Sequence, residues 1–325
     1  MTKPSVIIVS PALAAANNGN WQTALRWSRL LRSRYRVALS ASWEDQAADI
    51  MIALHARRSA ASISSFSHAH PARPLIVVLT GTDLYRDIVN NPEAQQSLAL
   101  ANRLVVLQEQ GLSALPADLR RKTMVIRQSA PALRAANDIA GTGSWCVTMA
   151  GHLREEKNPA CFIRAAALLA LPHLRFLQIG VALDPALEEQ ANALQRQHQH
   201  YRWLGNTSHV KTRHLISRSQ LLVLPSRMEG GANVIAEAIR SGVPVLASDI
   251  PGNRGMLGNE YFGYFPFDDS AALATLIQRC MQEPVFYGAL LRQCRRRAAL
   301  FSPAREQAAL LQLLDNVRHC QQEPS

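Results

Sequence analysis

Short apolar runs rich in β-branched residues recur along this chain, and helical patterns fill the intervals between them. Six such runs occupy the first half, at 6–9, 35–39, 50–54, 75–79, 104–107 and 124–126. Six more occupy the second half, at 146–149, 174–179, 201–204, 221–224, 244–247 and 261–265. Continuous apolar strands joined by crossover helices are typical of parallel sheets that are covered on both faces. The pattern therefore predicts an α/β protein with two Rossmann-like, doubly wound parallel-sheet domains.

The segment 134–144, with the sequence RAANDIAGTGS, separates the two series of strands, and its small and polar composition is typical of a linker. At 325 residues the chain also exceeds the length at which single cores usually split. We predict an N-terminal acceptor domain at 1–138, a C-terminal donor domain at 139–300, and a last helix at 301–325 that packs back toward the N-terminal domain. Because ligands bind at the carboxyl ends of parallel strands, we expect the two domains to face a central cleft.

A formal charge of +11 favours anionic partners, although charge alone does not choose among phosphorylated molecules, nucleic acid and an acidic membrane. Much of the excess lies in the clusters 29–36 and 292–297, which we interpret as solvated helix faces. Aromatic residues make up only 6% of the chain, and its tryptophans lie in or beside predicted core segments. A nucleic-acid-binding protein would present a basic stripe with exposed aromatic residues, so it is kept only as a remote, non-enzymatic alternative.

The five cysteines are odd in number and form no CxxC pair, so neither a disulfide framework nor a zinc site is indicated, and a reducing cytoplasm is expected. The apolar run from Lys3 to Ala16 contains Pro11 and leads into a βα unit, which favours a first strand over a signal peptide. No apolar run approaches the roughly 20 residues that span a bilayer. We expect no integral membrane segment, no cofactor and no metal. The oligomeric state is left open.

The strongest motif follows the strand at 221–224 and reads PSRMEGGANVIAEAIRSGVPVLASDIPG, from Pro225 to Gly252. Gly230 and Gly231 stand where the chain turns into a helix, so that backbone N–H groups and the helix dipole can approach an anion. Glu237, on that helix, can accept hydrogen bonds from vicinal hydroxyls, and Glu229 precedes it in the loop. The motif predicts a site for a diphosphate, with the candidate residues Ser226, Glu229, Gly230, Gly231, Ala232, Asn233 and Glu237.

The arrangement ExxxxxxxE, followed by Gly242, Pro244 and Val245, resembles the donor motif of the large retaining GT-B glycosyltransferase family. The resemblance implies the GT-B fold, metal independence, contact of Glu229 with the donor sugar and contact of Glu237 with the ribose. We therefore assign Glu229 a catalytic role.

A second motif, MAGHLREEKNP, follows the first strand of the second domain and runs from Met149 to Pro159. Asn158 is a good N-cap residue and Pro159 a good first helical residue, which places the cation of Lys157 at the start of a helix. In the GT-B family this loop carries an arginine and a lysine that bind the donor diphosphate. Gly151, Leu153 and Lys157 match, but His152 stands at the arginine position. We therefore count Lys157 among the candidate catalytic residues, as a cation that stabilises the leaving diphosphate. Arg154 either replaces that arginine or pairs locally with Glu155 or Glu156.

Loops after three strands of the first domain are candidates for the acceptor site. The first contains Asn17, Asn18, Gly19 and Asn20, at the start of a helix. The second reads LHARRSAAS and carries His55, a candidate catalytic residue, beside Arg57 and Arg58, of which at least one is expected to bind phosphate. The third reads LTGTDLYRD and contains Thr80, Gly81, Thr82 and Asp83. Asp83 is either a base or a helix cap, and an aspartate at such a turn favours the cap. Together these loops predict a small, anionic acceptor.

These motifs, GNWQTALRW, ALHARRSAAS, LTGTDLYRD and RLVVLQ with the two donor motifs, span 19–258 and are similar to those of the selenosugar synthases of selenoneine biosynthesis. The resemblance implies transfer of a sugar from a UDP-sugar such as UDP-N-acetylglucosamine to the selenium of selenophosphate. Deprotonated selenium is a strong nucleophile, so a dedicated base is unnecessary. The alternative is a GT4-like glycosyltransferase that acts on a hydroxyl of a carbohydrate, lipid or small molecule.

Overall fold

A computed structural model describes residues 3–12, 19–133, 144–171 and 173–319 of the chain. Its backbone divides into two compact units. The first comprises Met1–Ser129, Glu229–Ala232 and Pro303–Ser325, and the second comprises Ala130–Met228 and Asn233–Ser302. Four consecutive residues of the donor motif, Glu229–Ala232, therefore group with the first unit, whereas the residues on either side of them group with the second.

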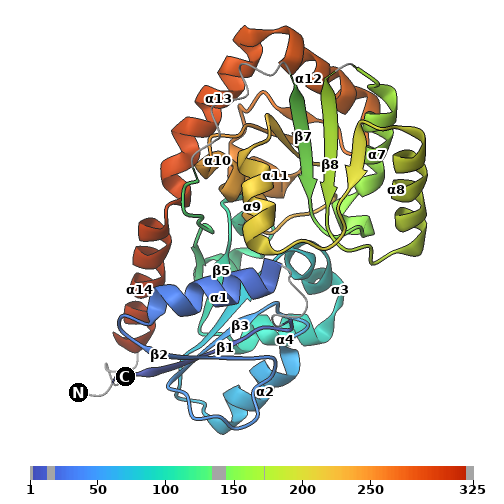
Figure 1. The fold of residues 1–325 in the computed structure, drawn as a ribbon. Coiled ribbons are helices and arrows are strands. Elements are labelled where there is room, and N and C mark those ends of the chain that lie inside the picture. The colour runs from blue at the N-terminus through green and yellow to red at the C-terminus, as the bar shows by residue number, and fades with distance from the viewer. Residues whose placement is uncertain (1–2, 13–18, 134–143, 172, 320–325) are drawn as a thin grey trace. The chain divides into compact units, whose positions relative to one another are not determined.

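The described part of the first unit contains a six-stranded parallel sheet in the order β2-β1-β3-β4-β5-β6 (Figure 1). Its strands are β1 (Ser5–Val9), β2 (Arg36–Ser40), β3 (Ile50–Leu54), β4 (Leu75–Leu79), β5 (Arg103–Val106) and β6 (Thr123–Val125). Its helices are α1 (Gly19–Leu31), α2 (Ala60–Ala69), the π-helix η2 (Asp83–Asp87), α3 (Ile88–Asn90), α4 (Pro92–Leu100), α5 (Gln110–Ser113), α6 (Ala117–Arg120) and α14 (Pro303–His319). The strand order reverses direction at β1, as in doubly wound sheets.

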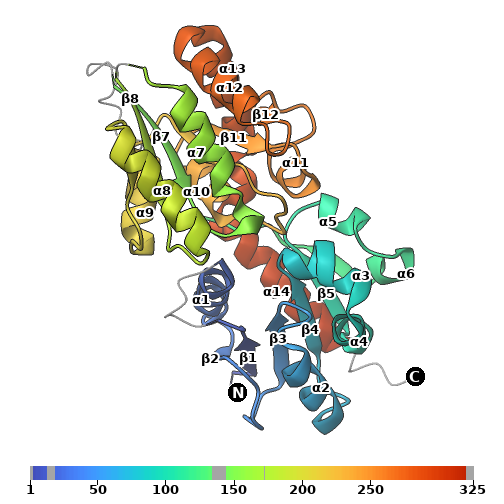
Figure 2. The ribbon, with the colours of Figure 1, turned by 90° about the vertical axis from the view of Figure 1, so that its right-hand side faces the viewer.

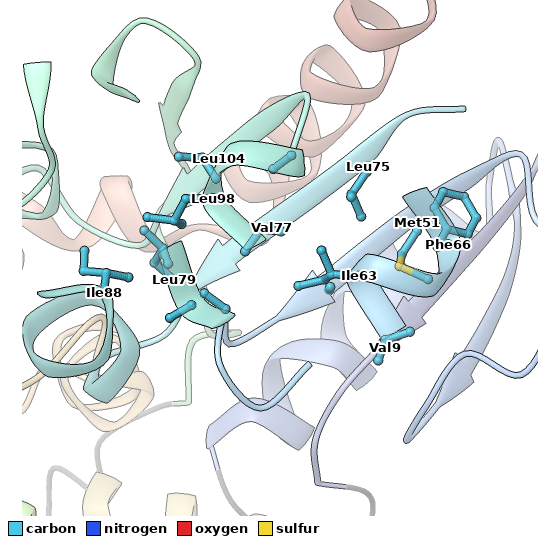
Figure 3. Close-up of a cluster of buried hydrophobic side chains, with 14 of the residues drawn as sticks. Val9, Met51, Ile63, Phe66, Leu75, Val77, Leu79, Ile88, Leu98 and Leu104 are labelled. Atoms are coloured by element: carbon cyan, nitrogen blue, oxygen red, sulfur yellow. The ribbon is translucent and has the colours of Figure 1, made fainter. Parts of the chain in front are cut away.

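Successive residues of these strands point to opposite faces of the sheet, and both faces are buried. Met51 and Val77 belong to one apolar cluster, which also takes Ile63 and Phe66 from α2 (Figure 3). Ile52 and Val78, the next residues along the same strands, belong to the opposite cluster, which α1 and α14 cover. Burial of both faces explains why the strands read as continuous apolar runs rather than alternating ones.

The carboxylate of Glu306 on α14 joins three segments of the first unit. It accepts hydrogen bonds from the indole Nε1 of Trp27 at 2.7 Å and from the backbone N–H of Ser129 at 3.0 Å. Its Oε2 also lies 2.8 Å from Nε of Arg26 in an ion pair. The Glu306 side chain is fully buried, so these partners supply the hydrogen bonds that water would otherwise give. They fix the start of α14 against α1.

A Glu306→Gln substitution is expected to lower the free energy of unfolding by about 2 kcal/mol, because it removes charge-assisted hydrogen bonds from a buried site. Urea denaturation of the full chain measures this change. Asp315→Asn is the matched control on the same helix, because Asp315 lies 3.6 Å from Arg34 in a pair of exposed side chains. The control substitution should lower the free energy of unfolding by less than about 0.5 kcal/mol. Equal effects of the two substitutions would contradict the role given to Glu306.

The second unit is built on another six-stranded parallel sheet, in the order β12-β11-β10-β7-β8-β9 among the described residues. Its strands are β7 (Trp145–Ala150), β8 (Leu174–Ile179), β9 (Tyr201–Trp203), β10 (Leu221–Leu224), β11 (Val245–Ser248) and β12 (Tyr264–Phe265). Its helices are η4 (Glu155–Lys157), α7 (Pro159–Leu168), α8 (Pro185–Gln197), α9 (His209–Ser217), α10 (Asn233–Arg240), α11 (Pro251–Leu257), α12 (Ser270–Gln282), α13 (Pro284–Ala298) and η5 (Ala299–Phe301). Figure 2 shows α7 and α8 side by side beside this sheet.

Each of the twelve runs predicted as strands coincides with a strand of the structure, with ends that differ by a few residues at most. The prediction of two doubly wound α/β domains is therefore confirmed. Within the ranges described, no helix is long and apolar enough to cross a membrane.

Candidate functional site

The loop after β7 brings two predicted donor residues together. Residues 151–154 leave the strand, η4 follows, and α7 begins at Pro159, the first helical residue that the sequence predicts. The methylenes of Lys157 pack over Gly151, with Cγ and Cδ each 3.7 Å from the position that a Cβ on Gly151 would take. Lys157 therefore lies at the carboxyl end of the central strand β7, directly before a helix N-terminus.

Asn158 precedes α7 as predicted, but its side chain does not cap the helix. Its backbone is left-handed, with φ of 46°, and its amide Nδ2 donates to Oδ1 of Asp268 at 3.0 Å. This hydrogen bond is the largest cause of a lowered pKa of Asp268. The capping prediction was wrong because a partner more than 100 residues away in the chain competes for the amide.

His152 and Arg154 have partners within the second unit. Nδ1 of His152 accepts a hydrogen bond from the backbone N–H of Val181 at 3.3 Å. Nε of Arg154 lies 3.8 Å from Oε2 of Glu156, which is the local ion pair that the sequence left open as one of two alternatives. His152 thus ties the loop after β7 to the loop after β8.

Gly180 was missed by the sequence analysis and shapes the same loop. It follows β8 with φ of +143°, a conformation that side chains rarely adopt. A Cβ at this position would lie 2.1 Å from the carbonyl oxygen of Gly151 and 2.9 Å from Cα of His152. Only glycine permits this approach. The signal available in the sequence is a glycine directly after a predicted strand, at the edge where ligands bind.

Ser226 is the second residue of the donor motif, and a hydrogen bond from a later segment holds its backbone. The hydroxyl of Ser248, at the end of β11, donates to the carbonyl of Ser226 at 2.5 Å. Nδ2 of Asn253 on α11 contacts the Ser248 hydroxyl at 3.1 Å. Ser226, Ser248 and Asn253 are all fully buried. Sequence reasoning missed Ser248 and Asn253, although both lie within the quoted donor motif or directly after it.

Four residues further along the motif, Glu229–Ala232, group with the first unit. A Cβ on Gly230 would lie 2.4 Å from the carbonyl carbon of Thr80 and 2.5 Å from the backbone nitrogen of Gly81. A Cβ on Gly231 would lie 2.5 Å from Cβ of Leu107. From the sequence, both glycines were expected to allow the approach of an anion. Close packing within the protein already requires them.

Glu229 is buried in the first unit and raises the pKa of a neighbouring tyrosine. Burial is the larger cause of the raised pKa of Tyr85, about 12, and the negative charge of Glu229 adds to it. The Tyr85 hydroxyl accepts a hydrogen bond from Nε2 of Gln108 at 2.8 Å. Tyr85 therefore keeps its proton at neutral pH and presents a neutral hydroxyl near the carboxylate.

Glu237 belongs to the second unit and lies on α10, the helix that Asn233 begins. Its side chain is only 7% exposed, and its Oε1 lies 2.6 Å from Nε2 of His209, the first residue of α9. Sequence reasoning missed His209, because nothing in the motif predicts which helix packs beside α10. Ser208 precedes His209 and caps α9 with its hydroxyl. A serine at this place indicates the start of a helix, so the start of α9 could have been predicted from the sequence.

His55, at the end of β3, is held between the predicted acceptor loops of the first unit. Its backbone φ is 75°, and its side chain is 3% exposed. Nδ1 accepts a hydrogen bond from the backbone N–H of Arg58 at 3.3 Å, and Nε2 lies 3.0 Å from the hydroxyl of Thr82. The neutral tautomer with hydrogen on Nε2 satisfies both contacts. Both ring nitrogens are thus engaged within the protein.

Burial is the largest cause of a lowered pKa of His55, with Asp83 acting in the opposite direction. Because the folded pKa lies below the ordinary value of about 6.5, the unfolded chain binds more protons in that window. Stability is therefore expected to fall as the pH drops below about 6.5. His55→Gln should make this decline shallower, as measured by urea unfolding at pH 7.5 and 5.5. His68→Gln, at an exposed histidine on α2, is the control and should not change how steeply the free energy of unfolding falls with pH.

Arg57 and Arg58 occupy different environments, as expected for adjacent arginines. Nε of Arg57 lies 2.9 Å from Oδ2 of Asp87, and Arg86 pairs with Oδ1 of the same carboxylate at 3.2 Å. Arg58 is exposed. Arg57 and Arg86 therefore share one buried carboxylate after β3 and β4, and Arg58 adds an exposed cation next to Arg57 in the chain.

Asp83 does not cap a helix, which corrects the expectation from the sequence. Its carboxylate is fully buried and accepts hydrogen bonds from the backbone N–H groups of Thr80 at 2.9 Å, Gly81 at 2.9 Å and Ala56 at 3.0 Å. These contacts give Asp83 the role of joining the loops after β3 and β4. A capping pattern and a loop-bridging carboxylate look alike in sequence, because both place aspartate directly after a turn.

Of the asparagine-rich loop after β1, Gly19 and Asn20 are the first two residues of α1. Asn17 and Asn18 lie outside the described residues. Across the described chain, no three histidine, cysteine or acidic side chains gather as they would around a metal ion.

A family model described as glycosyl transferases group 1 matches residues 134–300, slightly more than half of the chain. The chain belongs to this family. The matched region contains both donor motifs, so membership rests on the same part of the chain that carries Lys157 and Glu237.

A curated relative from Escherichia coli is named UDP-Gal:alpha-D-GlcNAc-diphosphoundecaprenol alpha-1,3-galactosyltransferase. It is 29% identical over 129 residues, which are 37% of this glycosyltransferase chain and 32% of the relative. The match spans about a third of that relative's length.

Two solved structures share the fold over nearly the whole chain. The Anabaena protein HepE in complex with UDP-glucose matches with a TM-score of 0.77 and 16% identity, over 96% of this chain and 100% of that one. A sucrose-phosphate synthase from Thermosynechococcus elongatus matches with a TM-score of 0.75 and 17% identity, over 98% and 99%. These likenesses confirm the expected GT-B class of two parallel-sheet domains.

Proposed function

We propose that this glycosyltransferase moves a sugar from a UDP-sugar, such as UDP-N-acetylglucosamine, to the selenium of selenophosphate. The observation that carries the donor half is the placement of Lys157 and Glu237 on two elements of the second unit that directly follow neighbouring strands, β7 and β10. The UDP and UDP-glucose complexes of the Anabaena protein support a uridine diphosphate donor.

In this proposal the N-terminus of α10, with Asn233, and the ammonium of Lys157 bind the donor diphosphate. A helix N-terminus carries partial positive charge and outward N–H groups, and Lys157 adds a full charge. Gly151, His152, Arg154 and Ser226 shape the loops around it. Glu237 accepts hydrogen bonds from the ribose, and Glu229 contacts the sugar. The charge that develops on the leaving diphosphate is thus stabilised by fixed groups.

The acceptor half of the proposal rests on the positive loops of the first unit. Arg57 and Arg86 share Asp87, and Arg58 is exposed beside them. The Thr82 hydroxyl is oriented by His55, and the Thr80 and Gly81 backbone by Asp83. Arginine and hydroxyl donors suit a phosphate group. A phosphorus oxyanion that carries selenium fits this chemistry and needs no base.

The step is a substitution at the anomeric carbon of the donor sugar. A selenium lone pair of selenophosphate forms the C–Se bond, while the bond from that carbon to the diphosphate oxygen breaks and UDP leaves with its electron pair. Water then cleaves the Se–P bond, which releases phosphate and the selenosugar. The enzyme contributes mainly position and electrostatic stabilisation.

The test follows UDP release from UDP-N-acetylglucosamine with and without selenophosphate. We expect release that depends on selenophosphate and is not supported by phosphate. Release at the same rate with no acceptor, or no release with selenophosphate, would refute the proposal.

A second candidate function has a hydroxyl acceptor, and the name of the Escherichia coli relative favours it, since that protein is named for transfer to a lipid-linked sugar. An oxygen nucleophile normally requires a base. His55 is the histidine that lies between the predicted acceptor loops, but both its ring nitrogens already have partners. UDP release that needs a sugar or lipid hydroxyl instead of selenophosphate would establish this alternative.

A further inference from the structure

We infer that His209 is a positioning residue that orients the Glu237 carboxylate for the donor ribose and thereby sets the enzyme's preference for a ribonucleotide. The inference rests on the proposed UDP-sugar donor and concerns a residue outside both donor motifs. His209 and Glu237 are 28 residues apart in the chain, and both belong to the second unit.

The contact is short and its direction is chemically fixed. Nε2 of His209 lies 2.6 Å from Oε1 of Glu237. An ionised carboxylate only accepts hydrogen bonds, so the imidazole must donate from Nε2. Hydrogen bonds to a charged acceptor are among the stronger ones in proteins.

Three features hold the imidazole in place. α9 packs against α10, which brings its first residue beside the middle of the neighbouring helix. The start of α9 is fixed by Ser208, whose hydroxyl accepts from the backbone N–H of Lys211 at 3.3 Å. A further hydrogen bond joins the hydroxyls of Thr207 and Thr212 at 2.7 Å. The donor is therefore pre-organised on a capped helix.

The two side chains differ in exposure, and the difference assigns their roles. Glu237 is 7% exposed, whereas His209 is 38% exposed. A buried carboxylate needs a hydrogen-bonding partner. Without one, the terminal torsion χ3 of glutamate has no single preferred value. With Oε1 bound to His209, the plane of the carboxylate is set, so that its oxygens present a fixed pair of acceptors. Vicinal ribose hydroxyls are the donors that such a fixed pair recognises.

The substitutions His209→Ala and His209→Gln separate this role from a structural one. Alanine removes the donor, whereas the glutamine amide nitrogen falls near the place of Nε2 and keeps it. His214→Ala is the matched control, because His214 is an exposed histidine on the same helix. Titration calorimetry of the full chain with UDP and with 2′-deoxy-UDP gives the readout.

We expect His209→Ala to raise the Kd for UDP by about 10-fold, the loss of one charge-assisted hydrogen bond. The Kd for 2′-deoxy-UDP should rise less, so the ratio of the Kd for 2′-deoxy-UDP to the Kd for UDP should become smaller. His209→Gln should stay within about 2-fold of the native Kd, and His214→Ala should not change it. At saturating donor, the kcat of His209→Ala should match that of the native enzyme, since His209 touches no reacting atom in this proposal.

An unchanged Kd for UDP in His209→Ala, or equal losses of affinity for UDP and 2′-deoxy-UDP, would overturn the inference. The proposed donor would still stand in either case, provided that the native protein binds UDP. A glutamine variant as weak as the alanine variant, with its melting temperature intact, would overturn it too. Native protein that binds neither nucleotide would instead refute the proposed donor, and the inference with it.

Discussion

A Lys157→Ala enzyme is expected to transfer sugar about 100-fold more slowly than the native enzyme, because one preorganised cation is lost where negative charge develops on the diphosphate. Lys157 lies on η4, between the end of β7 and the start of α7, and its methylenes pack over Gly151. The fall should appear in kcat at saturating donor. Initial rates of UDP release over a range of donor concentrations measure it.

Arg196→Ala provides the control for Lys157→Ala, since Arg196 is a cation of the same unit that is 64% exposed on α8 and pairs with Glu189. Its kcat should equal the native value. Undiminished transfer by Lys157→Ala would remove this lysine from the account of the donor site.

The second large effect is expected from Gly180→Ala, which should lower the free energy of unfolding by about 3 kcal/mol or more. A Cβ at this position meets the carbonyl oxygen of Gly151 at 2.1 Å, and φ of +143° is unfavourable for alanine. Relief of the clash must move residues 151–152, so UDP binding should weaken as well. Urea denaturation and calorimetry with UDP measure the two effects.

Gly288→Ala is the matched control for Gly180→Ala. Gly288 lies within α13, and its added Cβ would meet only the guanidinium end of Arg292 at 3.3 Å. Alanine favours a helix interior over glycine by about 0.5–1 kcal/mol, so the control should be neutral or slightly stabilising. A Gly180→Ala protein as stable as this control would contradict the close approach between the two loops.

The strands could be predicted because their signal is local. A parallel sheet buried on both faces requires continuous apolar segments, and 50–54 and 75–79 read as such without knowledge of their neighbours. The prediction of Pro159 as a first helical residue succeeded for the same reason, because its fixed φ suits that position.

Side-chain partners that are distant in the chain could not be predicted. Asn158 looks like a helix cap, but Asp268 takes its amide. Gly230 looks like a ligand-binding glycine, but the backbone of Thr80 and Gly81 already requires it. His209 carries no motif, and only the packing of α9 on α10 places it beside Glu237. In each case the sequence identifies the residue type that a loop needs, and the fold decides the partner.

The loops of the first unit show the same limit. The sequence places His55, Arg57 and Asp83 after strands, where ligand-binding residues are expected. It does not reveal that Asp83 is fully buried on three backbone N–H groups, or that Arg57 and Arg86 share Asp87. The positive charge of the arginines in these loops was predictable from composition, whereas the partner of each side chain was not.

The proposed joining of a donor sugar to selenium is tested most directly by the mass of the product. Native enzyme is incubated with UDP-N-acetylglucosamine and selenophosphate, and the products are separated and weighed by mass spectrometry. The account predicts a compound that contains N-acetylglucosamine and one selenium atom, recognisable by the isotope pattern of selenium, together with UDP. UDP formed alongside free N-acetylglucosamine and no selenium-containing sugar would contradict it.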